Sequence, residues 1–171
     1  QAFPERSMRS SWASTALMPG LPGQSNHTDL QPNHALTAGE LAVATNVDVV
    51  GNQTITVLRV ALPKSGTTSV RIPGSDIVPK PGEYLASPAL AKRIASLPAD
   101  QLGDRYGKQV GVLSPEAVEG PDSLVAVVGT DLGTVATSNF YIPPQVVTSF
   151  QGIAYENEAY RIATIVGAIA V

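Results

Sequence analysis

The two histidines, His27 and His34, are the residues whose type and spacing first suggest chemistry. They lie seven positions apart in a segment rich in Pro, Gly, Asn and Thr, with Asp29 between them. Imidazole and carboxylate groups bind zinc, but a zinc site needs further ligands at an ordered spacing, and the chain has no cysteine to supply one. The pattern therefore favours solvated loop histidines, and we expect no metal ligand here.

Two pairs of carboxylates could do acid–base chemistry: Asp100 with Asp104, and Glu156 with Glu158. Asp100 and Asp104 would share one face of a helix, because residues four apart are neighbours on a helix surface. Neither pair accompanies a cleft-forming motif, and no Gly-x-Ser-x-Gly elbow occurs. A solvated helix face is therefore the simpler interpretation.

Other polar motifs are weak. Residues 64–68, KSGTT, resemble part of a phosphate loop, but no glycine stands at the required spacing before the lysine, so we predict a surface turn. Glu116 and Asp122 flank turns and are interpreted as caps. The triplets 26–28 and 52–54 match the short glycosylation sequon, which also arises by chance. We predict no catalytic, cofactor-binding or metal-binding residue.

The composition excludes nucleic acid as a partner. The formal net charge is -3, no basic cluster occurs, and aromatic residues make up only 5% of the chain. A nucleic-acid surface needs basic side chains for the phosphates and, for single strands, aromatic platforms for the bases. The hydrophobic share of 43% is sufficient for a packed core.

A β-hairpin is the clearest element that the sequence predicts. Residues 41–50 and 54–62 alternate apolar and polar side chains, are rich in β-branched residues, and flank the turn signal Gly51-Asn52. We expect this hairpin to belong to a mixed sheet in an α+β domain. Further strands are expected at residues 108–113, 123–128 and 134–142.

Leu90, Ile94 and Leu97 recur at helical spacing and predict a helix over residues 88–97 that packs on one face of the sheet. Ser87 is a good cap, and Pro88 suits the first helical position. Shorter helical segments are expected at residues 99–106 and 114–116, with irregular loops at residues 19–39 and 63–81. The predicted core residues are Val43, Val49, Ile55, Val57, Val60, Val112, Val125 and Val127.

Both ends of the chain carry features typical of a membrane boundary. Residues 161–171, RIATIVGAIAV, are almost wholly apolar, although a membrane helix needs about 20 residues. Aromatic and basic side chains near both ends could mark the water–lipid interface: Trp12, Tyr160, Arg6, Arg9 and Arg161. The tail could also be a buried strand or helix, and the aromatic residues ordinary packing.

Three sequence phrases lie between residues 81 and 129: PGEYLASPALAKRIAS (81–96), PADQLGDRYG (98–107) and GPDSLVAVVG (120–129). This stretch resembles the extracytoplasmic region of FtsX/MacB-like ABC transporter permeases of the kind found in actinobacteria. The upstream TITVLRVAL (54–62) and the tail AYRIATIVGAIAV (159–171) follow the same order as in that family.

The resemblance implies a single extracytoplasmic domain between membrane helices, at the cell membrane. Residues 1–17 and 153–171 would be stalk helices around an α/β core at residues 40–142. A cytoplasmic ABC ATPase subunit would hydrolyse ATP and move the helices. The other implied partners are a second permease copy or half, and a lipid, peptide or lipoprotein cargo. The domain itself would be no enzyme.

Two other functions stay open from the sequence alone. A secreted or membrane-anchored module for peptide or cell-wall ligands would have a single anchor and a defined groove. A small hydrolase with an unrecognised serine or carboxylate pair would have a pocket with convergent titratable groups.

Overall fold

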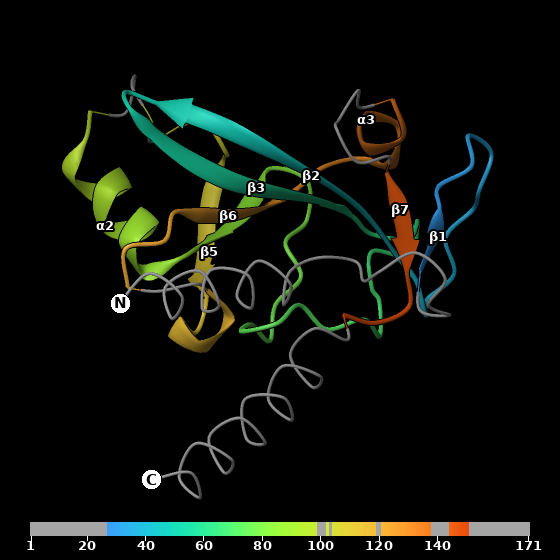
Figure 1. The fold of residues 1–171 in the computed structure, drawn as a ribbon. Coiled ribbons are helices and arrows are strands. Elements are labelled where there is room, and N and C mark those ends of the chain that lie inside the picture. Colours follow the sequence, from blue (N-terminus) through green and yellow to red (C-terminus); the bar gives the residue numbers. More distant parts are fainter. Residues whose placement is uncertain (1–26, 99–101, 103, 119–120, 138–143, 151–171) are drawn as a thin grey trace, which may run out of the picture.

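A seven-stranded mixed sheet organises this computed structural model, which describes residues 27–98, 102, 104–118, 121–137 and 144–150 (Figure 1). The strand order is β1-β7-β2-β3-β6-β4-β5. The strands are β1 (His27–Asp29), β2 (Leu41–Val50), β3 (Gln53–Ala61), β4 (Glu83–Ala86), β5 (Lys108–Val112), β6 (Val125–Gly129) and β7 (Gln145–Val147). The helices are α2 (Pro88–Ser96) and α3 (Leu132–Ala136), with a 3₁₀ turn η2 (Pro115–Ala117).

The predicted α+β class with a mixed sheet is therefore confirmed, and the sheet also includes two short strands outside residues 40–142. The expected stalk helices, residues 1–17 and 153–171, lie outside the described residues. Within the described part of the chain, no helix has the length and apolar character needed to cross a membrane.

The predicted hairpin is confirmed as β2 and β3. The two strands stay in unbroken antiparallel register from Ala42 opposite Ala61 to Val50 opposite Gln53. Gly51 has a φ of 62°, and no non-glycine residue among those described has a positive φ. A two-residue loop with a positive φ at its first position only is the type II′ turn, whose twist matches that of the strands.

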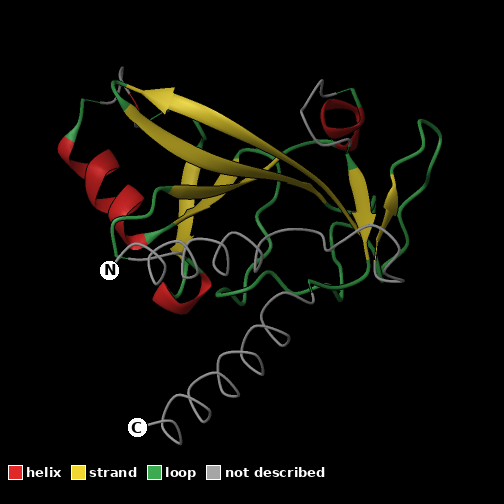
Figure 2. Ribbon diagram, in the orientation of Figure 1, coloured by secondary structure: helices red, strands yellow, loops and turns green. Residues whose placement is uncertain are grey.

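The helix α2 connects two parallel neighbours, β4 and β5, in a β-α-β unit. It begins where the sequence predicts, because the Ser87 hydroxyl accepts the Leu90 N–H and Pro88 needs no hydrogen bond of its own. Leu90 is fully buried, and Ile94 and Leu97 are partly buried against the same core cluster. The predicted packing of this helix on the sheet is confirmed (Figure 2).

The sheet is covered on both faces. The irregular segment of residues 63–81 places Val70 and Ile72 against the core side chains of one face, so it is a covering layer as well as a loop. On the other face α2 and Tyr106 cover one half of the sheet, and Val135 of α3 covers the other half. All five residues of β6 are buried, as expected for a strand inside such a sheet.

Two of the eight predicted core residues are wrong. Val49 and Val112 are 59% and 50% exposed, because the free half of β2 and the edge strand β5 have no covering layer over these side chains among the described residues. The other six are buried: Val43, Ile55, Val57, Val60, Val125 and Val127.

The strand predicted at residues 134–142 is also wrong over its described part. Residues 132–136 form the helix α3, and Asp131 caps it by accepting the Thr134 N–H at 2.8 Å. This cap and the burial of Val135 outweigh the strand preference of Thr and Val. Residues 104–106 form a turn where a helix was expected, and the rest of that segment is largely outside the described residues.

Candidate functional site

The first and last described strands lie side by side at one end of the sheet (Figure 1). β1 pairs with β7 in antiparallel register, with His27 opposite Val147 and Asp29 opposite Gln145. The Leu30 N–H extends this pairing by donating to the Pro144 carbonyl at 2.9 Å. The segments before residue 27 and after residue 150 are therefore attached to neighbouring points of the same sheet.

β7 is held between β1 and the start of β2, where Leu41 lies opposite the same Val147. Val147 is fully buried, and Phe150 packs against the core cluster on one face. Leu30 packs against the cluster on the other face, beneath α3. β1 and β7 are therefore both joined to the packed core of the sheet.

His34 belongs to a local brace in the loop after β1. Its Nε2 lies 3.1 Å from Oε2 of Glu40, and Oε1 of Glu40 accepts the Thr37 N–H at 2.8 Å. The Thr37 N–H is the largest of the causes that hold the pKa of Glu40 below its usual value, and His34 contributes. Among the described residues no group of three His, Cys, Asp or Glu could hold a metal ion, and the His27 side chain is not described.

A polar cluster around Asp48 joins the hairpin to the chain after α2. Oδ2 of Asp48 accepts Nη1–H of Arg105 at 2.9 Å and the Tyr106 hydroxyl at 2.8 Å. The Tyr106 ring meets Tyr84 edge to face, with ring centres 5.8 Å apart. These bonds connect the hairpin to residues 105 and 106, so the cluster stabilises the fold. No sequence signal indicates it, since Asp48 and Tyr106 are 58 positions apart.

Burial opposes ionisation of Asp48, but the hydrogen bonds from Tyr106 and Arg105 outweigh it and lower the pKa of the carboxyl. Burial is also the main reason that the pKa of Tyr106 is raised, followed by its bond to Asp48. The phenol therefore stays protonated at neutral pH and donates to an ionised carboxylate.

Replacing Asp48 with asparagine should lower the free energy of unfolding by about 1 kcal/mol at pH 7. A carboxyl whose pKa is lowered on folding contributes stability above its unfolded pKa, about 3.9, and loses it as the pH falls through the folded pKa. The deficit should therefore shrink as the pH falls from about 5 through the lowered pKa of the folded state, as measured by urea unfolding. Exposed Asp76→Asn is the control; an Asp48→Asn deficit independent of pH would contradict the charge-based account.

The remaining candidates from the sequence are not brought together by the structure. Residues 64–68 form the predicted surface turn, with Gly66 at a φ of 79° and Thr68 donating to the Glu40 carbonyl. Asp104, Asp122 and the triplet at residues 52–54 are exposed. The other candidates lie outside the described residues or side chains: Arg6, Arg9, Trp12, Asn26, Asp100, Glu116, Glu156, Glu158, Tyr160 and Arg161.

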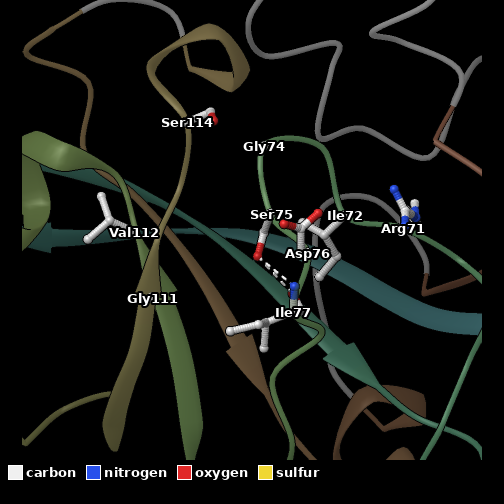
Figure 3. A pocket seen from close by; sticks show the side chains of 9 residues that line it. All are labelled: Arg71, Ile72, Gly74, Ser75, Asp76, Ile77, Gly111, Val112 and Ser114. Atoms are coloured by element: carbon white, nitrogen blue, oxygen red, sulfur yellow. Dashed lines mark hydrogen bonds between the residues drawn. The ribbon is translucent and has the colours of Figure 1, made fainter.

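An open hollow of about 540 Å³ lies between residues 71–77 and the end of β5 (Figure 3). Ser75 shapes its wall, since its Oγ both accepts the Ile77 N–H and donates to the Ile77 carbonyl, each at 3.0 Å. Ile77 and Val112 expose apolar side chains there, and Arg71 and Asp76 add one charge of each sign. These groups could hold a ligand, but the Ser75 hydroxyl bonds the backbone of Ile77 and not the neighbouring Asp76 carboxylate.

Comparison with protein-family models, with curated proteins and with solved structures finds no match to this chain.

Proposed function

We propose that this chain is the extracytoplasmic domain of an FtsX/MacB-like ABC transporter permease. The observation that supports it most is the pairing of β1 with β7. A domain inserted between two membrane helices must begin and end near one membrane surface. Attachment of both flanking segments to neighbouring strands meets that requirement, and the sequence resemblance of residues 81–129 is independent of it.

In this proposal the domain receives motion and catalyses no reaction. A separate cytoplasmic ATPase subunit hydrolyses ATP and shifts the two flanking helices relative to each other. Their shift acts on β1 and β7, and the hydrogen bonds of β7 to β2 pass it to the hairpin. A packed core moves as a rigid body under such a load, and the loops between elements absorb the change. The cargo would be a lipid, peptide or lipoprotein.

The proposal predicts that the parent reading frame encodes a membrane span on each side of these residues. These 171 residues contain no cysteine, so Val112→Cys in the full-length protein places the one cysteine of this domain at a half-exposed position, and the full-length protein without the substitution is the labelling control. A membrane-impermeant maleimide should label it in intact cells. A parent protein with one span or none, or labelling only after lysis, would contradict the proposal.

A second candidate function, a secreted or anchored binding module, is favoured by the hollow beside β5. It predicts that a peptide or cell-wall fragment shifts the amide NMR signals of residues 71–77 and 111–114 on titration. A saturable shift with a parent protein that has a single anchor would select this function over the transporter.

A further inference from the structure

The hairpin half of β2 is an open strand edge. β7 pairs only with Leu41–Val43, whereas β3 pairs with β2 from Ala42 to Val50. Among the described residues no strand therefore pairs with the outer side of residues 44–50, and in Figure 1 this part of β2 forms a border of the sheet.

The backbone groups along this edge can be assigned to a side. Thr56 donates its N–H to Leu124 and Val60 accepts from Thr130, so the even-numbered residues of β3 face β6. The odd-numbered residues of β3 then face β2, and their partners on β2 are even-numbered. The N–H and C=O groups of Thr45, Val47 and Val49 therefore point outward. The Val49 N–H donates to Oδ1 of Asp48 at 3.1 Å, so a further strand would have to replace that bond.

This edge has few of the features that normally prevent strand pairing, and Asp48 is its one charged residue. Residues 44–50 contain no Lys and no Pro, and the register with β3 has no bulge. Val47 and Val49 are 61% and 59% exposed on one face of the strand. The opposite sheet edge, β5, has both protections, since it begins with Lys108 and its pairing with β4 is irregular.

We propose that the outer edge of β2 pairs with β2 of a second copy of this chain, antiparallel and about a two-fold axis at Val47. Val47 then lies opposite Val47, and Thr45 opposite Val49. About six backbone hydrogen bonds form, two for each pair of outward-facing residues, and in two of them the Val49 N–H exchanges Oδ1 of Asp48 for the Thr45 carbonyl of the other copy. This pairing depends only on β2, so it stands whether or not the proposed function is correct.

The side chains on the other face of β2 favour this register. Asn46 of one copy lies opposite Asp48 of the other, so no two carboxylates oppose each other. Oδ1 of Asn46 is buried and has no hydrogen-bond partner among the described residues. Arg105, which carries five N–H donors and gives one to Asp48, lies beside that oxygen in the pair.

The neighbouring registers are worse. Centring the pair on Asp48 places the two Asp48 carboxylates opposite each other. Centring it on Asn46 requires Val49 to pair with Val43, whose outer side β7 already occupies. Because a two-fold pair uses the β2 edge of both copies, association through this edge stops at a dimer, and the β5 edge has the protections given above.

Disulfide trapping tests the pair in the 171-residue chain. Val47→Cys introduces the sole cysteine, and residues opposite each other in a hydrogen-bonded pair have Cα atoms about 5.5 Å apart, within the range of a disulfide. Oxidation with diamide should give a covalent dimer. A protein concentration of about 50 µM is suitable, because it is close to the dissociation constant expected for a small interface. Val112→Cys, half exposed on the opposite edge of the sheet, should cross-link at least about tenfold more slowly.

Sedimentation equilibrium provides the second measurement. The unmodified chain should show a monomer–dimer equilibrium with a dissociation constant of about tens of micromolar, as expected for a small interface. Val47→Lys should raise the dissociation constant at least about tenfold, and Val112→Lys should leave it unchanged. Val47 is exposed, so circular dichroism should show both variants folded. A monomer at every concentration, or Thr45 and Val47 amides protected from exchange within the monomer, would overturn the proposal. The second result would mean that the chain covers its own edge.

Discussion

Replacing Gly129 with alanine is expected to lower the free energy of unfolding by about 3 kcal/mol or more. A Cβ at this position would overlap the backbone carbonyl of Lys80 and lie 2.6 Å from the Pro79 oxygen. Both obstacles are backbone atoms, so no side chain can rotate away. The φ of Gly129 is not positive, which means that the loss would be purely steric.

The turn that meets Gly129 is fixed from several sides. The Glu83 N–H donates to the Lys80 carbonyl at 2.9 Å, and the Glu83 carboxylate accepts the Lys80 N–H at the same distance. Gly82 has a φ of 87°, and its carbonyl accepts the Lys108 N–H at the start of β5. Moving this turn away from β6 would therefore disturb β4 and β5 as well.

Gly39→Ala is the matched control, because its Cβ would meet nothing closer than Ser69 Oγ at 3.9 Å and its φ is not positive. Its effect should stay within about 0.5 kcal/mol. Urea unfolding followed by circular dichroism measures both variants. Equal stabilities for Gly129→Ala and the unmodified chain would show that the turn at residues 80–83 does not pack on β6.

The elements that the sequence predicts well are those with complete local signals. The hairpin has two long alternating runs around a turn residue with the required conformation, Gly51. The helix α2 has its own cap, a proline at its first position and apolar residues at helical spacing. Each of these signals lies within about 20 residues, so no distant partner has to be known.

The elements that the sequence does not predict depend on distant partners. β4 has four residues, and β1 and β7 have three each, too few to show a period. Their pairing comes from segments far along the chain, as when His27 meets Val147. The alternation of apolar and polar residues also cannot show which part of a strand is covered. Val43 and Val49 lie on the same face of β2, yet among the described residues only Val43 has a layer packed over it.

The candidate site also depends on residues that are far apart in the sequence. The two flanking segments are attached side by side only once β1 and β7 have paired. The polar cluster around Asp48 depends on Tyr106, which comes from a different part of the chain. Both the proposed coupling through β7 and the proposed dimer edge at β2 therefore depend on the sheet staying intact. Substitutions that loosen the sheet should weaken both.

Ser87→Ala should lower the free energy of unfolding by about 2–3 kcal/mol, a large effect for one hydroxyl group. Ser87 is fully buried, and its Oγ donates to the Ser123 carbonyl at 2.7 Å. The same oxygen accepts the Leu90 N–H of α2 at 3.3 Å and the Val125 N–H of β6 at 3.0 Å. One side chain thus caps the helix and fixes it to the central strand.

The size of this effect follows from what alanine leaves behind. The helix would lose its cap, which costs about 1 kcal/mol, and the buried Val125 amide would lose its acceptor, which costs about 1–3 kcal/mol. Ser96→Ala is the control within α2, because its exposed hydroxyl bonds only its own helix, at the Arg93 carbonyl, and its loss should stay within about 0.5 kcal/mol. Faster amide exchange at Val125 in Ser87→Ala, but not in Ser96→Ala, would identify the link between helix and sheet as the source. Equal small losses for both serines would instead reduce Ser87 to an ordinary cap, and the attachment of α2 to the sheet would then depend on the apolar contacts of Leu90, Ile94 and Leu97.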